Sequence, residues 1–376
     1  YAAERSELIG QRLRERGIVP GDIESRADLH KIPLLDREDL RERAEALTAR
    51  GLARGEALAN STGGSTGSNV PFLVDRGCWR ERDATDLRSW QFLGLKPGAR
   101  AAVVWGSPMD ASRADHWRQK LRRLVDNRRF ISAYRIGEDA IDPILNWLAR
   151  SQPEVLMGYS SVLDRLARRA GHRGGLPGPR FVVSSAETLF PDQRDRIEKA
   201  WGAEVFNLYG CREFGLVAIE CPRHRGLHLM DERVAVEIVP EANDGPGELL
   251  ITDLDNRATP FIRYQVGDLA EKGEMAPCPC GRGLSRLGAV LGRSFEVIRG
   301  PSGGAVGGTF WSLLLRTAVK GIDTFQVVQH ELDRLEILVT PRDVLDARAR
   351  QDLTALIREA LGEEVRVEFT ERDELE

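Results

Sequence analysis

Hydrophobic and polar residues follow two different periods along this chain, and the change of period separates helices from strands. Near the N-terminus, the apolar residues Leu8, Ile9 and Leu13 recur at the spacing of one helix face. Asp36 precedes a further stretch that contains Leu40, and an aspartate at that place can cap a helix. The pattern predicts helices within residues 1–50 and at residues 79–93, 141–149, 162–170 and 191–201.

Short apolar runs alternate with these helices, and each run ends in a polar or glycine-containing turn. Such runs are typical of buried parallel strands, and they lie at residues 101–105, 155–157, 181–183 and 205–208. The alternation predicts an α/β fold with a mainly parallel sheet. Ligands bind beyond the carboxyl ends of such strands. We therefore expect a site where polar clusters follow the runs, at residues 158–161, 184–187 and 209–213.

The pattern changes after residue 227. Apolar runs at 234–239 and 248–252 have no helical stretch between them, which predicts an antiparallel or barrel-like β-rich subdomain over about 221–291. Strands and a helix then follow at residues 325–329, 335–339, 343–361 and 365–369. We predict a large domain over residues 1–291 and a small, mobile α+β domain over residues 292–376, joined by a hinge near Gly292.

Composition is that of an ordinary globular protein. The 376 residues are 41% hydrophobic and 30% charged, with a formal net charge of −4. This charge gives no reason to expect general binding to nucleic acids or membranes, and the arginine-rich residues 113–129 are expected to form a solvated helix. No apolar run approaches the roughly 20 residues that span a bilayer, and no signal peptide opens the chain. Five cysteines, an odd number, favour a reducing cytoplasm.

The stretch STGGSTG at residues 61–67 has the composition of a phosphate-binding loop. Glycines allow backbone N–H groups to approach an anion closely, and hydroxyls add further donors. No lysine lies in the stretch, so it is not a Walker A loop; taken alone, it could also be a flexible linker. The candidate residues are Ser61, Thr62, Gly63, Gly64, Ser65, Thr66 and Gly67.

Four motifs follow one another over nearly the whole chain. They are STGGSTG at 61–67, YGCRE at 209–213, RYQVGD at 263–268 and LGRS at 291–294. In this order they resemble the phosphate loop, the Tyr-Gly-x-Thr-Glu motif, the Arg-Tyr-x-x-Gly-Asp motif and the Gly-Arg hinge of the adenylate-forming (acyl-CoA synthetase-like) superfamily. The segments GLH and CPCGR are similar to its phenylacetate–CoA ligase and capsule-biosynthesis branch.

The resemblance implies that a carboxylic acid reacts with ATP to give acyl-AMP, and that coenzyme A then accepts the acyl group. It implies that the loop binds the β- and γ-phosphates and that Glu213 binds Mg²⁺, a cation that prefers oxygen ligands. It also implies that Asp268 bonds the ribose hydroxyls and that Arg293 contacts ribose or phosphate. The adenine pocket would contain Tyr209, Gly210, Ser185, Ala186 and Glu187. Taken singly, Glu213 and Asp268 could merely cap turns, and Tyr209 could be a core residue.

Two departures from the family pattern affect the chemistry. Arg212 stands where the motif has threonine, and it could pair with the substrate carboxylate or with phosphate. We therefore group it with Glu213 and Arg293 as a catalytic candidate. The family carries a catalytic lysine near its C-terminus, whereas no lysine follows Lys320 here. We expect the native chain to continue and to carry that lysine.

Cysteine and histidine residues gather in two segments about 50 residues apart. Cys221, His224 and His228 lie in the first, and Cys278 and Cys280 lie in the second. Three thiolates and one imidazole would form a closed structural Zn²⁺ site. His228 is the preferred fourth ligand because GLH matches the family pattern, although His224 has the tighter spacing. The alternative is that these cysteines are free thiols in turns.

The acid itself is not named by the sequence. Trp105, Tyr159, Phe214 and Gly215 are the candidate substrate-binding residues, and their character favours an aryl or similar hydrophobic acid. Transfer to an amine, a hydroxyl or a carrier-protein thiol remains open, as does a degenerate fold that binds nucleotide without catalysis. A homodimer is likewise left open.

Overall fold

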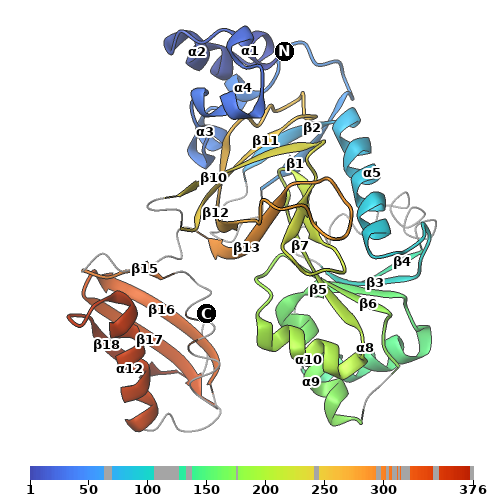
Figure 1. Ribbon diagram of the computed structural model, residues 1–376, viewed down its shortest axis with the longest axis vertical. Coiled ribbons are helices and arrows are strands. Elements are labelled where there is room, and N and C mark those ends of the chain that lie inside the picture. Colours follow the sequence, from blue (N-terminus) through green and yellow to red (C-terminus); the bar gives the residue numbers. More distant parts are fainter. Residues whose placement is uncertain are drawn as a thin grey trace. The chain divides into compact units, whose positions relative to one another are not determined.

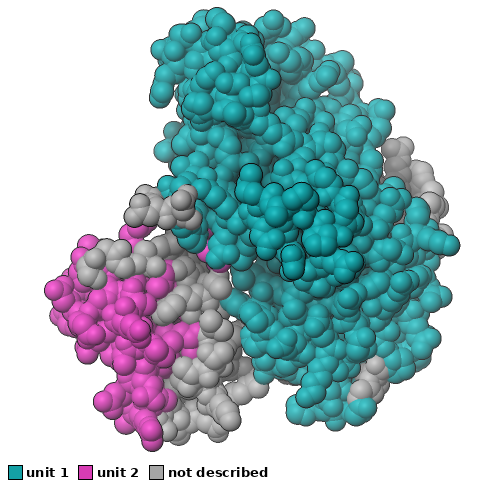
Figure 2. Space-filling model, in the orientation of Figure 1, with its two compact units in different colours: residues 1–266, 270–290 teal, residues 267–269, 291–376 magenta. Residues whose placement is uncertain are grey.

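The computed structural model describes residues 1–62, 70–105, 127–132, 138–174, 177–240, 245–293, 298–301, 305–306, 311, 314, 322–341 and 347–372. The chain divides into two compact units (Figure 2). Unit 1 contains Tyr1–Val266 and Ala270–Val290, and unit 2 contains Gly267–Leu269 and Leu291–Glu376.

Short helices form the N-terminal fifty residues, as predicted. They are α1 (Ala2–Arg5), α2 (Glu7–Glu15), α3 (Arg37–Glu42) and α4 (Ala44–Leu47), with 3₁₀ turns at Pro20–Asp22 and Arg26–Lys31. The side chain of Asp36 accepts a hydrogen bond from the Asp39 N–H and thereby caps α3, which confirms its predicted role. Leu8 and Leu40 have no exposed surface, so the apolar faces of these helices enter the core.

One sheet of eleven strands lies mostly in unit 1, in the order β10-β11-β12-β13-β9-β8-β7-β6-β5-β3-β4. Figure 1 labels most of these strands. Its parallel part confirms the predicted α/β fold, with every neighbouring pair from β4 to β7 parallel. The parallel strands are β3 (Ala101–Trp105), β4 (Arg128–Ser132), β5 (Val155–Tyr159), β6 (Phe181–Ser185) and β7 (Glu204–Cys211).

Apolar residues on both faces of this parallel part are buried. Val182 on one face packs with α8 (Glu138–Ser151), α9 (Ser160–His172) and α10 (Pro191–Trp201), which Figure 1 shows gathered together. Its neighbours Phe181 and Val183 enter a separate cluster that also contains Trp90, on α5 (Arg76–Phe92). Alternate residues of a strand point to opposite faces, so a continuous apolar run is the sequence signature of a strand covered on both sides.

The basic helix predicted over 113–129 is wrong at its C-terminal end. Residues 106–126 lie outside the described part of the chain, but Arg128 and Arg129 begin β4. Ala101 pairs with Arg128, so β4 extends the sheet at its edge. An edge strand can expose charged side chains to water just as a surface helix can. The run of arginines therefore could not distinguish a solvated helix from this edge strand.

The strands predicted after residue 227 are present, and they continue the same sheet. The predicted strands are β10 (Val234–Pro240) and β11 (Gly247–Asp253). The same part of the sheet also contains β8 (Gly215–Glu220), β9 (Leu227–Leu229), β12 (Tyr264–Lys272) and β13 (Arg286–Arg293), which were not predicted as strands. The hairpin of β1 (Ala57–Ser61) and β2 (Pro71–Asp75) packs with them and with the N-terminal helices in one core.

Unit 2 has its own small core. The strands β16 (Ile322–Glu331), β17 (Arg334–Pro341) and β18 (Arg366–Glu371) form a sheet, and α12 (Ala347–Leu361) connects the parallel pair β17 and β18. Ile337 and Ile357 are fully buried between them, and burial of such a side chain contributes about 1.5–3 kcal/mol. Two short strands, β14 (Ile298–Arg299) and β15 (Ala305–Val306), pair separately. The hinge near Gly292 and the mobility of this unit stay predictions.

Among the described residues, no helix combines the length and the apolar character needed to cross a membrane.

Candidate active site

The carboxyl ends of the parallel strands carry several predicted site residues. Trp105 ends β3, Tyr159 ends β5 and Ser185 ends β6, and Tyr159 pairs with Ser185 in register. The rings of Trp105 and Tyr159 are stacked, with centroids 4.6 Å apart and planes 23° apart. The sheet thus brings an aromatic platform and a polar strand end to one edge, as the sequence predicted.

The segment after β6 is bonded to the start of α9. Ala186 has φ = 66°, in the left-handed region that residues other than glycine rarely adopt. The Glu187 carboxylate accepts hydrogen bonds from the Ser161 N–H at 2.8 Å and from the Ser161 hydroxyl at 3.0 Å. A carboxylate at a helix N-terminus is stabilising. Glu187 is therefore a helix cap, a role that sequence reasoning missed; its predicted contact with adenine stays a prediction.

The YGCRE segment forms the end of β7 and a tight turn, residues 212–214, into β8. A bulge lies between Tyr209 and Gly210. A Cβ atom at Gly210 would lie 2.5 Å from the carbonyl oxygen of Gly215, and Gly215 itself has φ = 72°. Both positions therefore require glycine for the turn to form. The geometry of the turn is enough to explain why residue 215 is a glycine, and the predicted contact of Gly215 with substrate stays a prediction.

The three residues of the turn differ in their exposure to solvent. Phe214 has no exposed surface and packs against Phe261 and Tyr264, with ring centroids 5.5 Å and 6.2 Å away. Its predicted place in a substrate pocket is thus corrected to a place in the core. Glu213 is 8% exposed, and Arg212 is half-buried.

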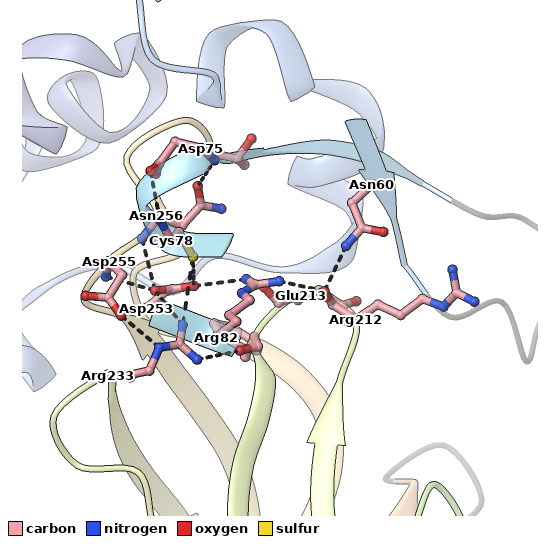
Figure 3. Close-up of polar contacts among 12 residues, drawn as sticks. Asn60, Asp75, Cys78, Arg82, Arg212, Glu213, Arg233, Asp253, Asp255 and Asn256 are labelled. Carbon is pink, nitrogen blue, oxygen red and sulfur yellow. Dashed lines mark hydrogen bonds and ion pairs between the residues drawn. The ribbon is translucent and has the colours of Figure 1, made fainter. Parts of the chain in front are cut away.

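Sequence reasoning missed the side chains that bond to this turn. Asn60, Arg82 and Arg233 each donate to one or more of its backbone carbonyl groups (Figure 3). The sequence carried only one weak signal for Arg82. It follows Cys78 at helical spacing, so both residues lie on the same face of α5, which is the buried face.

Asp268 and Arg293 meet within unit 2. Arg293 Nε lies 3.1 Å from Asp268 Oδ1, so the residue predicted for the ribose and the residue predicted for ribose or phosphate are brought together. Arg263, the first residue of the same motif, has a structural role. It bonds to the Glu237 carboxylate and to the backbone carbonyls of His30 and Ile32.

The base of the predicted phosphate loop is well defined. Thr62 N–H donates to the Val70 carbonyl at 2.9 Å, and Val70 N–H donates to the Thr62 hydroxyl oxygen at 3.1 Å. Thr62 is 2% exposed. Five predicted phosphate-binding residues lie outside the described part of the chain, namely Gly63, Gly64, Ser65, Thr66 and Gly67.

Cys221, His228, Cys278 and Cys280 gather in one cluster, with all four candidate ligand atoms within 4.8 Å of one another. Cys221 Sγ and Cys278 Sγ are 3.8 Å apart, and Cys280 Sγ is 3.4 Å from His228 Nε2. The five cysteines, all within the described residues, form no disulfide. Three sulfur ligands and one imidazole nitrogen fit a tetrahedral structural Zn²⁺ site.

His224, the other histidine that the sequence left open, lies outside this cluster. Its ring stacks on Phe206, and its Nδ1 is 3.2 Å from a carboxylate oxygen of Glu220. Glu220 also accepts two hydrogen bonds from Arg194 at 2.9 Å. His224 is thus part of a polar network beside the cluster.

Arg286 fixes the two segments that carry the cluster. Its Nη1 donates to the Arg225 carbonyl at 2.7 Å, and its Nη2 donates to the Ala276 carbonyl at 2.5 Å. Burial raises the pKa of Cys221 to about 11, whereas for Cys280 burial is outweighed by hydrogen bonds from Arg282, which lower its pKa to about 7. Burial and the charges of Arg282 and Arg286 lower the pKa of His228, which favours a neutral imidazole.

The described geometry combines a parallel sheet edge, the YGCRE turn, the Asp268–Arg293 pair and a small α+β unit. No family model matches the chain. Its sequence relatives and the solved structures with a similar fold nevertheless agree, and both support the adenylate-forming (acyl-CoA synthetase-like) superfamily that the motifs resemble.

Two sequence relatives define the similarity. Protein CapK of Staphylococcus aureus is 23% identical over 340 residues, which cover 89% of this chain and 74% of that protein. Phenylacetate–coenzyme A ligase of Thermus thermophilus is 25% identical over 332 residues, which cover 80% of this chain and 69% of that protein. The second is a phenylacetate–CoA ligase, the kind of protein that the motifs resemble.

Two solved structures share the fold. 2-Hydroxyisobutyryl-CoA ligase, in a postadenylation state with R3-HIB-AMP, has a TM-score of 0.77 and 21% identity, covering all of this chain and 84% of its own. The anthranilate CoA ligase AuaEII with anthranoyl-AMP has a TM-score of 0.62 and 14% identity, covering 87% of this chain and 66% of its own.

Proposed function

We propose that this chain activates a carboxylic acid with ATP as acyl-AMP and then transfers the acyl group to coenzyme A. The observation that carries the proposal is the YGCRE turn. It holds Glu213 and Arg212 next to the carboxyl ends of parallel strands, in a chain whose relatives include phenylacetate–CoA ligases. The bound acyl-AMP named for the similar structures supports the first step, and the CoA named for 2-hydroxyisobutyryl-CoA ligase supports the second.

In the first step, a carboxylate oxygen attacks the α-phosphorus of ATP. The bond from that phosphorus to the pyrophosphate oxygen breaks, and pyrophosphate leaves with the electron pair. Mg²⁺ would supply charge neutralisation for the phosphates, and Glu213 would hold it. Arg212 would bring positive charge to the acid or the phosphate, and Asp268 would accept hydrogen bonds from ribose.

In the second step, the thiolate of coenzyme A attacks the acyl carbonyl carbon and AMP leaves. Arg293 would contact ribose or phosphate during both steps. The alternatives for the acceptor are an amine, a hydroxyl or a carrier-protein thiol, and each would leave the first step unchanged. A carrier-protein partner, a homodimer and a cytoplasmic location remain predictions from the sequence.

We propose an aryl or similarly hydrophobic acid as the substrate. The stacked rings of Trp105 and Tyr159 support this, because offset aromatic surfaces favour a further ring or an apolar chain beside them. Both side chains are only partly buried, so they have surface left for a ligand.

We also propose that Cys221, His228, Cys278 and Cys280 hold one structural Zn²⁺. The support is the convergence of four ligand atoms from two segments that Arg286 bonds together. A zinc ion there would join the turn after β8 to the turn before β13.

The test of the proposed function is pyrophosphate release with a panel of aryl, alkyl and hydroxy acids, with and without coenzyme A. We expect ATP-dependent release with at least one hydrophobic acid, and a thioester product when coenzyme A is present. Release without thioester would indicate another acceptor. No release with any acid, from protein that still binds ATP, would favour the non-catalytic alternative.

A further inference from the structure

The turn that carries Glu213 is bonded to a buried arginine of α5. Arg82 is 7% exposed. Its Nη1 donates to the carbonyl of Arg212 at 3.2 Å, and its Nη2 donates to the carbonyl of Glu213 (Figure 3). Because the guanidinium is planar and its donors have a fixed arrangement, the two bonds together constrain both position and tilt of this backbone.

Close packing accompanies these hydrogen bonds. A Cβ atom at Gly215 would lie 3.2 Å from Cδ of Arg82, which is tighter than ordinary contacts. The Arg82 side chain therefore lies directly against the turn, with little room for another position. Its aliphatic part and its charged end both contact the same segment, residues 212–215.

Two further side chains bond to the same turn. Asn60 Nδ2 donates to the Arg212 carbonyl at 3.2 Å, and Arg233 Nη1 donates to the Phe214 carbonyl at 3.3 Å. Three consecutive carbonyl groups of the turn thus accept hydrogen bonds from side chains of separate parts of the fold. Most buried carbonyls are instead paired within helices or sheets.

The charges of this network balance. The side chain of Asp253 has no exposed surface, and its Oδ2 lies 3.3 Å from Arg82 Nη2. Arg233, 2% exposed, lies 4.0 Å from the other oxygen of Asp253 and donates through Nε to Asp255 at 2.9 Å (Figure 3). Two cations therefore face two anions, as a buried ionic network requires.

Desolvating four charges is costly, and apolar residues of similar volume could fill such a space with equal or greater stability. Directional bonds to the turn are what apolar residues could not supply. Because apolar residues could not form these hydrogen bonds, and because Glu213 lies in the turn, the network is best explained as fixing the direction of the backbone at residues 212–214.

We propose that Arg82 is a positioning residue for adenylation. Through the carbonyls of Arg212 and Glu213 it determines the direction in which these two side chains leave the backbone. Arg233 and Asp253 hold Arg82 and the end of the turn in place. This inference rests on the proposed function, because that function assigns Glu213 to Mg²⁺ and Arg212 to the acid or phosphate.

Asn60 has a similar positioning role for the hairpin of β1 and β2, which carries the predicted phosphate loop. It precedes Ser61, near the end of β1, where the predicted phosphate loop begins. Its hydrogen bond to Arg212 joins two motifs that are 152 residues apart in the sequence. Asn60 is therefore a second positioning residue, and it keeps the hairpin in register with the turn.

The test compares Arg82→Lys and Asn60→Leu with Arg80→Lys, an exposed arginine on the same helix. A lysine side chain keeps the charge beside Asp253 but has a single nitrogen, so it lacks the paired donors. Leucine keeps the approximate size of asparagine and removes the donor. The measurements are amide hydrogen exchange over residues 208–216, Mg²⁺-dependent ATP binding, and the Mg²⁺ concentration that gives half-maximal adenylation.

We expect Arg82→Lys and Asn60→Leu to accelerate exchange over the turn and to raise the Mg²⁺ requirement about fivefold, the factor that one lost hydrogen bond supplies. Arg80→Lys should match the wild type throughout. A merely structural role would lower the melting temperature without changing the Mg²⁺ requirement of the folded fraction.

The inference is overturned if exchange over the turn and the Mg²⁺ requirement equal those of the wild type. Should Arg82→Lys fail to fold, Asn60→Leu provides the same measurements. Failure of the proposed function is a different result, namely a wild-type chain that forms no acyl-AMP from any acid. Exchange and Mg²⁺-dependent ATP binding need no turnover, so they would still decide between a positioning role and none.

Discussion

Arg293 and Asp268 form an ion pair in unit 2, with Arg293 Nε 3.1 Å from Asp268 Oδ1. They are 25 residues apart and belong to different strands, β12 and β13. The contact orients one carboxylate oxygen of Asp268 and places it beside a cation. An ionised acceptor forms stronger hydrogen bonds than a neutral one, which is the property that binding of ribose hydroxyls requires.

Asp268→Ala should therefore weaken nucleotide binding. Loss of hydrogen bonds to a charged acceptor costs about 1.5–3 kcal/mol, which corresponds to roughly 10- to 150-fold in Kd. We would measure ATP and AMP binding by calorimetry. Asp333→Ala is the matched control, because Asp333 pairs with Arg366 on the surface of the same unit. Equal affinities of Asp268→Ala and wild type would remove Asp268 from the nucleotide site.

The zinc content of two variants should show which of the two candidate histidines binds the metal. Wild-type protein should contain one zinc per chain after washing with a mild chelator, by elemental analysis. His228→Ala should lose the metal because only His228 faces the three thiols, and its melting temperature should fall. His224→Ala should keep it. Wild-type protein without zinc, or metal loss in His224→Ala alone, would contradict the assignment.

The two histidines also show where sequence reasoning is limited. Spacing along the chain favours His224 as a partner of Cys221, whereas pairing of β9 with β13 places His228 opposite Arg286. The paired residues His228 and Arg286 are 58 positions apart (286 − 228), and pairing over such a distance has no local signature, so spacing alone could not decide. A match to a family pattern favoured His228, and the fold places it with the thiols.

The parallel sheet edge was predictable for a different reason. Continuous apolar runs such as Ala101–Trp105 are required when helices cover both faces of a sheet, and the polar ends of the strands then meet at one edge. The arginines Arg82 and Arg233 were not predictable. Charged residues are usually exposed, and burial of a pair depends on carboxylates supplied by distant segments, here Asp253 and Asp255.

Changes at the aromatic platform should alter the preference for the acid. Trp105→Ala removes one ring of the stacked pair, which is worth about 0.5–1.5 kcal/mol, or roughly 2- to 12-fold. We expect KM for an aryl acid to rise by that factor and KM for ATP to stay constant. Trp105→Phe should restore most of the affinity. Phe130→Ala, at an exposed position of the edge strand β4, is the control. Equal KM values for aryl acids in Trp105→Ala and wild type would exclude the platform from the acid site.

Cys78 should be unreactive in the folded protein and should make stability depend on pH. Burial, together with the charge of Asp253, raises the pKa of its thiol to about 12, whereas an unfolded cysteine ionises near 8.5. At pH 8 alkylation of Cys78, followed by mass spectrometry, should therefore be absent until denaturant is added.

A raised folded-state pKa means that the folded state retains a proton which the unfolded state loses. The contribution of Cys78 to stability is therefore complete below about pH 8.5 and is lost progressively between about pH 8.5 and 12. One group changes the free energy of unfolding by at most about 1.4 kcal/mol per pH unit. The free energy of unfolding of Cys78→Ala should therefore fall less steeply with pH over this range than that of the wild type, by up to that amount per pH unit. Urea unfolding at pH 8, 9, 10 and 11 measures the difference. Parallel pH profiles for Cys78→Ala and wild type, or rapid alkylation of native Cys78 at pH 8, would show that the thiol is not held neutral beside Asp253.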